Sequence, residues 1–271
     1  MQLIDLSTLL DPDDRARLPA PLAAAAGVVA PQVAYLRPDS TEGKDRFCGF
    51  FGCSHDDLPD GEGWGAETLT DMSSHCGTHV DAPMHSGSRC EGRPARTIDQ
   101  IRLDELFLPG VVLDVRPLVQ PAASITADMI EAALAAIGDP AIEGCAVLIR
   151  TGQERYRIGD PEFFRYPGMT RESTLYLTGL GARVLGTDAI GWDRPFGVMA
   201  AEFQRTGDRQ QLWDAHKAIT VREAFIVQQL CNLGALPSTG FHVGFFPIKL
   251  ARASAAPARA VAFVDTAWTA A

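Results

Sequence analysis

One segment stands out in this sequence, Ser74-His75-Cys76-Gly77-Thr78-His79-Val80-Asp81-Ala82-Pro83-Met84-His85. It places three of the chain's six histidines and one aspartate within eleven residues, the densest set of metal-ligand side chains in the sequence. His75, His79, Asp81 and His85 are separated by four, two and four positions. Because side chains alternate along an extended chain, these even spacings predict that all four point to one side of an extended segment.

The donor types in this segment favour an open metal site. Two imidazoles and a carboxylate suit Zn, Mn or Fe as a divalent ion, and the six cysteines include no Cys-x-x-Cys pair for a closed thiolate site. Gly77 and Pro83 disfavour a helix and let an extended segment bend. The alternative is that the histidines only hydrogen-bond in a turn, but four ligand-type side chains on one side argue against it.

Composition narrows the class of protein and of partner. With 271 residues, 46% hydrophobic and 21% charged, the chain can form one large α/β domain. The net charge of -10, without a basic run, argues against nucleic acid or an anionic membrane and favours a small-molecule partner. Scattered cysteines, no signal-peptide pattern and no run of 18 apolar residues predict a cytoplasmic protein with reduced thiols.

Apolar runs and helical periodicity alternate along the second half of the chain, which predicts an α/β fold. The predicted strands cover residues 111–115, 145–150, 183–188, 241–250 and 260–264, and the predicted helices cover 101–106, 126–138, 174–180 and 196–205. Pro247 predicts an edge or bulged strand, and residues 251–260 are expected to form a loop. Asp188 and Asp193, which follow the third strand, are interpreted as turn residues.

Residues 1–63 are interpreted as an N-terminal arm and active-site cover within the same domain as residues 64–271. Between residues 8 and 63 the sequence is rich in Pro, Gly, Asp and Ala and shows little periodicity. Phe47, Phe50 and Phe51 in this arm, together with Trp64, could form an apolar wall for a flat substrate. A role in the core is the alternative for these aromatic residues.

The metal-ligand segment resembles the His-x-Gly-Thr-His-x-Asp-x-Pro-x-His signature of the metal-dependent cyclase family, which includes kynurenine formamidase, isatin hydrolase and trans-dienelactone hydrolase. Supporting segments follow in the same order: Val147-Leu-Ile-Arg-Thr151-Gly, Gly186-Thr-Asp188-Ala, Trp213-Asp-Ala-His216-Lys, Leu230-Cys-Asn-Leu233 and Pro247-Ile-Lys. The resemblance covers most of the chain from about residue 64 onward. It implies a single α/β domain with a central, barrel-like mixed sheet flanked by helices, of the swivelling β/β/α type, and a homodimer or homotetramer.

Carried onto this sequence, the resemblance implies that His75, His79 and Asp81 bind the metal and that His85 donates and accepts protons. His216 would line the site and bind substrate. In formamidase-like members a Glu follows this last His by twelve residues and completes a two-metal site, whereas this chain has Gln228 there. A glutamine can bind a metal through its carbonyl oxygen but cannot bridge two cations as an anion. One divalent ion, Mn or Zn, is therefore expected.

The resemblance implies a hydrolase that opens a cyclic amide or lactone, or cleaves an aryl amide, with metal-activated water. His85 would relay the proton, a task that suits an imidazole. One alternative is a polyketide-type cyclase that uses the same site without net hydrolysis. Another is an inactive binding homologue.

Overall fold

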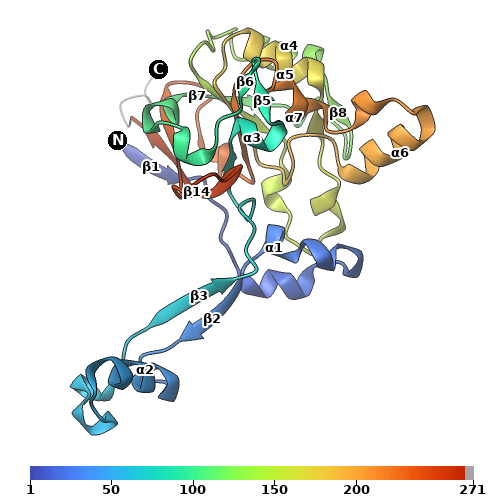
Figure 1. The fold of residues 1–271 in the computed structure, drawn as a ribbon. Helices are drawn as coiled ribbons and strands as arrows, with labels where there is room; N and C mark the ends of the chain where they lie inside the picture. Colours follow the sequence, from blue (N-terminus) through green and yellow to red (C-terminus); the bar gives the residue numbers. More distant parts are fainter. Residues whose placement is uncertain (266–271) are drawn as a thin grey trace. The chain divides into compact units, whose positions relative to one another are not determined.

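The computed structural model describes residues 1–265 (Figure 1). Contacts divide the chain into two compact units. The smaller unit is Leu10–Ser73, and the larger consists of Met1–Leu9 and the chain from Ser74 onward. The metal-ligand segment and His216 therefore belong to the larger unit, whereas Phe47, Phe50, Phe51 and Trp64 belong to the smaller one.

The larger unit is built around a closed, barrel-like sheet (Figure 1). Among the described residues, seven strands follow one another in the order β14-β13-β7-β9-β11-β12-β4, and β4 pairs with β14 again. These strands are β4 (His79–Asp81), β7 (Phe107–Asp114), β9 (Ala146–Arg150), β11 (Val184–Thr187), β12 (Phe225–Gln228), β13 (Phe241–Pro247) and β14 (Ala255–Val264), and β1 (Gln2–Asp5) pairs with β14 from outside the ring. Strands β7, β9, β11 and β12 are parallel, and the other pairings are antiparallel. The predicted α/β fold with a barrel-like mixed sheet is confirmed.

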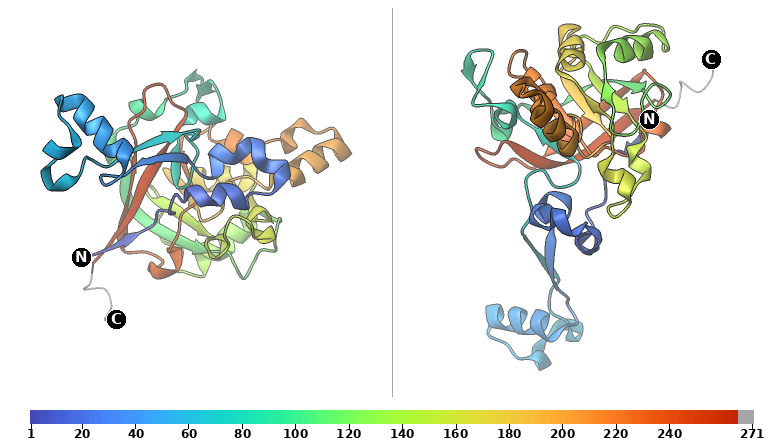
Figure 2. Two further views of the ribbon diagram at one scale, coloured as in Figure 1. Left: turned by 90° about the horizontal axis from the view of Figure 1, so that it is seen from below. Right: turned by 90° about the vertical axis from the view of Figure 1, so that its right-hand side faces the viewer.

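Side chains alternate along the strands and form two hydrophobic cores, one inside the barrel and one outside it. In β9, Ala146 and Leu148 pack inside the barrel, whereas Val147 and Ile149 pack outside it. The outer core includes residues from α4 (Ala127–Ala135), α5 (Arg171–Gly179) and α7 (Asp214–Ala218). Helices α4 and α5 lie side by side over the sheet in Figure 1 and in the right-hand view of Figure 2. The helices thus bury one face of the parallel strands, as expected for such a sheet.

Most predicted helices and strands of the larger unit are present. Thr126 caps α4 by accepting a hydrogen bond from the backbone N–H of Met129 at 3.4 Å. Helix α6 (Phe196–Thr206) ends at Gly207, whose positive φ of 70° suits a glycine at a helix end. The remaining short elements of this unit are α3 (Pro83–Ser86), β5 (Arg89–Cys90), β6 (Arg93–Pro94), β8 (Ser124–Ile125), β10 (Gly168–Met169) and the 3-10 turns Ile98–Gln100, Leu103–Glu105, Gln153–Arg155, Pro161–Phe164, Arg209–Gln211 and Leu233–Ala235.

Three predictions about local structure were wrong. Strand β13 lies between β14 and β7 and is therefore not an edge strand. Pro247 is tolerated in it because this proline is the last residue of the strand, where the ladder ends. Residues 251–260 do not form a loop throughout: β14 starts at Ala255, where Ala255, Ala256 and Pro257 pair with β4. The helix predicted at 101–106 is reduced to the 3-10 turn Leu103–Glu105.

The smaller unit contains more regular structure than its sequence indicated. Strands β2 (Gln32–Leu36) and β3 (Ala66–Thr70) form an antiparallel pair. Between them lies α2 (Thr41–Phe51), which Ser40 caps through a 3.0 Å hydrogen bond from the N–H of Gly43. Helix α1 (Ala26–Val29) and the 3-10 turns Pro12–Arg17, Ala20–Ala25, His55–Asp57 and Pro59–Gly61 complete the unit. Two glycines inside α2 weaken its helical pattern in the sequence.

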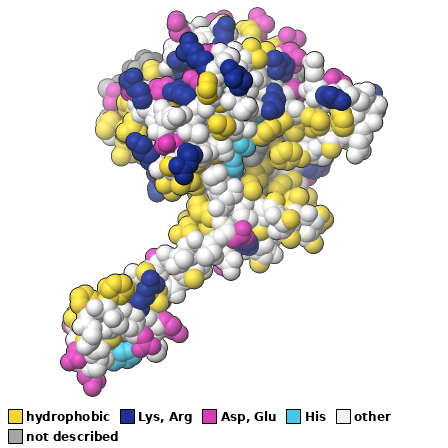
Figure 3. Space-filling view, in the orientation of Figure 1, with side chains coloured by type: hydrophobic (Ala, Val, Ile, Leu, Met, Phe, Trp, Pro, Cys, Tyr) yellow, Lys and Arg dark blue, Asp and Glu magenta, His cyan; other side chains and the backbone are white. Residues whose placement is uncertain are grey.

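The distribution of charge on the surface and the length of the helices are the two remaining features of the fold. Lys and Arg side chains are interspersed with Asp and Glu on the face of the larger unit in Figure 3. No helix between residues 1 and 265 combines the length and the apolar character that a membrane span requires.

Candidate metal centre

Strand β4 places two of the predicted ligands on one side of the sheet. His79 and Asp81 lie two residues apart, and Val80 between them packs inside the barrel. The two polar side chains therefore point to the outer side, the side of Ile226 on β12, which belongs to the outer core. Backbone pairing with both β12 and β14 fixes this short strand.

The His79 ring is oriented by a backbone carbonyl. Its Nδ1 lies 2.8 Å from the oxygen of Gly77, and a carbonyl oxygen can only accept, so Nδ1 carries the hydrogen. Gly77 has a φ of 63°, a left-handed conformation that favours glycine. Nε2 of His79 is buried and has no hydrogen-bond partner among the described residues. Burial lowers the pKa of His79, which keeps Nε2 deprotonated and able to bind a metal.

Asp81 is completely buried and presents one oxygen to two histidines. Its Oδ1 lies 2.9 Å from Nδ1 of His75 and 3.5 Å from Nε2 of His79, yet it accepts no hydrogen bond within the described chain. Burial alone would raise the pKa of Asp81, but the neighbouring histidines hold it well below its usual range. Ligand atoms of all three residues lie within 4.8 Å of one another, so the structure brings the three predicted ligands together around one point.

Gln228 lies directly opposite His79 in the pairing of β12 with β4. Its Nε2 donates a 2.7 Å hydrogen bond to Oδ2 of Asp81. The amide nitrogen must face the carboxylate, because two oxygens would repel each other. Gln228 therefore satisfies Oδ2 and leaves Oδ1 directed toward His75 and His79, and its predicted role as a metal ligand stays a prediction.

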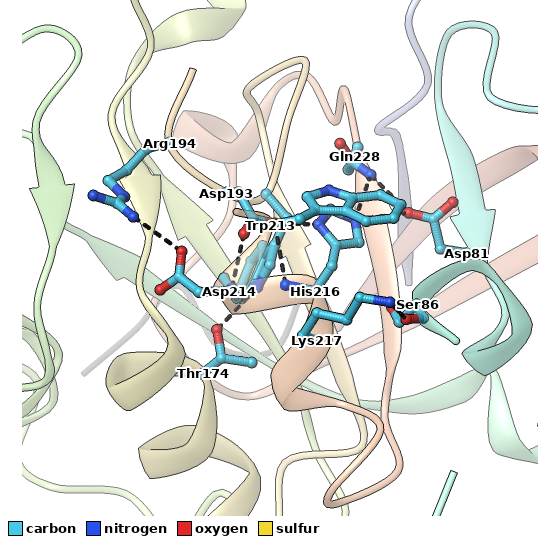
Figure 4. A network of polar contacts seen from close by, with 12 residues as sticks. Asp81, Ser86, Thr174, Asp193, Arg194, Trp213, Asp214, His216, Lys217 and Gln228 are labelled. Atoms are coloured by element: carbon cyan, nitrogen blue, oxygen red, sulfur yellow. Dashed lines mark hydrogen bonds and ion pairs between the residues drawn. The ribbon is translucent and has the colours of Figure 1, made fainter. Parts of the chain in front are cut away.

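Asp193 holds His216 through two hydrogen bonds and the preceding Ala215 through a third (Figure 4). Its carboxylate accepts hydrogen bonds from the backbone N–H of Ala215 at 2.7 Å and of His216 at 3.1 Å, and from Nδ1 of the His216 ring. Nε2 of His216 then faces the cluster, 3.5 Å from Oδ2 of Asp81. Burial opposes protonation of His216, but Asp193 and Asp81 outweigh it and raise its pKa to about 9. The interpretation of Asp193 as a turn residue missed this contact, because its partner lies 23 positions further along the chain.

His85 reaches the cluster from a helical turn after β4, and His75 from a turn before it. The prediction that all four residues lie on one extended segment was therefore wrong for these two. Pro83 starts α3, which suits its fixed φ and missing N–H, and His85 follows in that turn. Its ring lies 4.0 Å from the ring of His75 and 5.3 Å from that of His216, centroid to centroid. Burial lowers the pKa of His85 to about 4. Asp81, His85 and His216 form a second group of ligand atoms within 4.8 Å.

Trp213 belongs to this cluster, although the sequence analysis gave it no role beyond its place in a segment that carries the family resemblance. Its ring lies 4.7 Å from the ring of His216 and 4.8 Å from that of His85. The available signal was its position three residues before His216.

The aromatic residues predicted to bind substrate form a cluster within the smaller unit. Trp64 contacts Phe47 at 5.3 Å, Phe50 at 5.2 Å and Phe51 at 6.2 Å between ring centroids. Phe50 and Phe51 are 73% and 65% exposed, which excludes a core role for these two rings. Their role in substrate binding stays a prediction.

Comparison with known proteins identifies the relatives of this chain. Residues 4–194 match the family model described as "Putative cyclase". Isatin hydrolase from Roseibium aggregatum is 28% identical over 211 residues, which cover 72% of this chain and 74% of the relative.

Solved structures share the fold at lower identity. An isatin hydrolase bound to the product analogue thioisatinate superposes with a TM-score of 0.72 at 23% identity, over 97% of this chain and 92% of the other. A potential metal-dependent hydrolase with cyclase activity gives a TM-score of 0.63 at 22% identity, over 97% and 98% of the two chains.

The contact between Asp193 and His216 should make the stability of the metal-free protein depend on pH. The folded-state pKa of His216 is raised to about 9, against about 6.5 in an unfolded chain. The stabilisation is then fully present below about pH 6.5 and lost as the pH rises through about 9. Denaturant unfolding with a chelator should show the largest difference in unfolding free energy between wild type and Asp193→Asn near pH 6, shrinking toward pH 9.

A matched control is Asp214→Asn, because Asp214 is a half-buried carboxylate that pairs with the guanidinium of Arg194 and not with an imidazole. The difference in unfolding free energy between wild type and Asp214→Asn should be the same near pH 6 and near pH 9. A constant effect of Asp193→Asn over the range would contradict the assignment.

Proposed function

The chain belongs to the cyclase family, and on that basis we propose that it is a metal-dependent hydrolase that opens a cyclic amide or lactone, or cleaves an aryl amide. One observation carries the proposal: Nε2 of His79 and Oδ1 of Asp81 are buried without hydrogen-bond partners in the described chain. Both converge with His75 on one point. Orphaned buried polar atoms are costly, and a cation at that point would satisfy both. The similarity to an isatin hydrolase supports an amide as substrate.

His75, His79 and Asp81 would hold one divalent ion, Mn or Zn. The donor set of two imidazoles and a carboxylate fits such an ion with a position open to substrate. When bound, the ion supplies Lewis acidity that polarises a carbonyl group and acidifies water. Gln228 argues for one ion and against two. Its amide N–H donates to Oδ2 of Asp81, and its neutral side chain brings no negative charge for a second cation.

His85 is the residue we assign to proton transfer. With its pKa lowered to about 4, its imidazole is neutral at pH 7 and can accept a proton from water and pass it to the departing nitrogen or oxygen. His216, fixed by Asp193, presents Nε2 to the same space and can hydrogen-bond the substrate. Gln228 keeps the Asp81 carboxylate from rotating.

Assembly and location complete the proposal. The partner is a small, cyclic or aromatic molecule, and the protein acts in the cytoplasm. The exposed rings of Phe50 and Phe51 support a homodimer or homotetramer, because a monomer rarely leaves such large apolar side chains side by side in water.

Elemental analysis of the purified protein should find about one Mn or Zn per chain. His79→Ala should lose most of this metal, whereas the exposed His242→Ala should retain it. Gln228→Glu should raise the content toward two, because a carboxylate beside Asp81 and His216 supplies the missing negative charge. Two ions in the wild type would contradict the single-ion proposal, and no ion under any metal supply would contradict the metal centre.

The metal-loaded protein should add one water to isatin or a related cyclic amide. His85→Ala should lower turnover by on the order of 10²- to 10⁴-fold while the metal content stays at the wild-type level. Product mass and elemental analysis of the same samples measure both effects. Equal loss of metal and turnover would contradict the separate role of His85, and a product lighter by one water would identify a cyclase.

Sedimentation velocity should detect an oligomer that depends on the exposed rings of α2. Replacing Phe50 and Phe51 by Ser should shift the protein to a smaller species, because it removes the apolar surface available for association. Phe196→Ser is the control, since Phe196 is 74% exposed in the larger unit. An unchanged oligomer in the double variant would argue against assembly through α2.

A further inference from the structure

We propose that Trp213 is a specificity-determining residue, whose indole ring stacks against the aromatic ring of the substrate and selects aryl amides over saturated ones. The proposal rests on the proposed function and narrows its substrate class. Trp213 combines a large indole side chain with a left-handed backbone conformation.

Trp213 adopts a backbone conformation that is unfavourable for a bulky residue. Its φ is 58° and its ψ is 40°, the left-handed region in which glycine and asparagine are preferred. Two contacts hold this conformation: the carbonyl of Trp213 accepts the N–H of Lys217 at 3.0 Å, and its own N–H points to Sδ of Met199 at 3.4 Å. Such strained residues concentrate where the side chain has a functional position.

The indole ring of Trp213 does not pack in the hydrophobic core. Trp213 is half-buried and belongs to neither hydrophobic cluster of the described chain. Trp192 offers the contrast, because it is 1% exposed, packs in the outer core and donates a 3.1 Å hydrogen bond from Nε1 to Thr174. Of these two tryptophans, Trp192 therefore has a structural role in the outer core, whereas the core does not explain the packing of Trp213.

The neighbours of the indole are the groups of the candidate site. Its ring is tilted by 31° against that of His216 at 4.7 Å and meets His85 edge-on at 4.8 Å. In Figure 4 it lies across His216, on the side of Asp81 and Gln228. Lys217 restrains the ring, because its Nζ lies 5.9 Å from the ring centroid and donates to the carbonyl oxygen of Ser86.

This position suits recognition of a flat ring. A substrate whose carbonyl group lies near His85 would bring its ring beside the indole. Aromatic pairs gain from offset or edge-on contact beyond the area that they bury, and a saturated ring lacks this gain. From the usual strength of such pairs, we expect roughly a two- to tenfold preference for an aromatic ring.

The test is equilibrium binding of benzoate and cyclohexanecarboxylate to the metal-loaded full chain, measured by calorimetry. Wild type should bind benzoate more tightly, and Trp213→Asn, which suits the left-handed backbone but lacks the ring, should lose the preference. Trp213→Phe should keep it, as should the control Phe196→Leu, whose ring is exposed elsewhere in the same unit.

Two results would overturn the proposal: a benzoate preference that persists in Trp213→Asn, or no preference in wild type. If Trp213→Asn does not fold, Trp213→Leu gives the same comparison. Hydrolysis of isatin, of an aryl lactone and of an acyclic aryl amide by the same preparations is measured separately. Its absence in wild type would overturn the proposed function, whereas the binding ratio still decides the role of Trp213.

Discussion

The candidate site depends on the closure of the barrel by β4. This strand has only three residues, yet it pairs with β12 on one side and with β14 on the other. A short strand held on both sides cannot slip, since a shift by one residue would turn Val80 outward and bury His79 and Asp81 in the barrel. The hydrophobic interior of the barrel thus determines which way the polar side chains point. The same pairing brings Gln228 opposite His79, so closure also supplies the hydrogen bond to Asp81.

Hydrogen bonds orient the buried carboxylate and the imidazoles of the site, and they leave two polar atoms, Oδ1 of Asp81 and Nε2 of His79, without a hydrogen-bond partner in the described chain. Asp81 divides its two oxygens, with Oδ2 accepting from Gln228 and Oδ1 directed toward His75 and His79. His79 is fixed by the carbonyl of Gly77, and His216 by Asp193. In His79 and in His216, Nδ1 thus makes a hydrogen bond and Nε2 faces the site. Such hydrogen bonds orient metal-binding or catalytic imidazoles in proteins. The cost of the remaining orphaned atoms explains why such a cluster suits a cation.

The sequence predicts the parts of this site that are local and regular. The spacing of His79 and Asp81 was sufficient to predict a shared side, because both residues lie in one strand. The spacing of His85 failed, because Pro83 starts a helical turn before it. The contact of Asp193 with His216 and the left-handed backbone of Trp213 arise from tertiary structure, and no local pattern indicates them. The α/β class could be expected from alternating apolar runs, and the barrel only from family resemblance. Helix α2 was hidden by its internal glycines.

His85 and His216 lie 5.3 Å apart between ring centroids, yet their environments differ in a way that bears on their roles. No carboxylate among residues 1–265 forms an ion pair with the His85 ring, so burial outweighs the attraction of Asp81 and lowers the pKa of His85 to about 4. His216 is more deeply buried than His85, but the Asp193 carboxylate on Nδ1 and Asp81 beyond Nε2 outweigh this burial and raise its pKa to about 9. Two imidazoles whose pKa values are driven apart can hold opposite protonation states at pH 7. In the proposed reaction a neutral His85 is suited to accept a proton, while a cationic His216 is suited to stabilise negative charge on the substrate oxygen. The difference follows from Asp193, which contacts one of the two rings, and so the division of roles depends on a residue outside the signature segment.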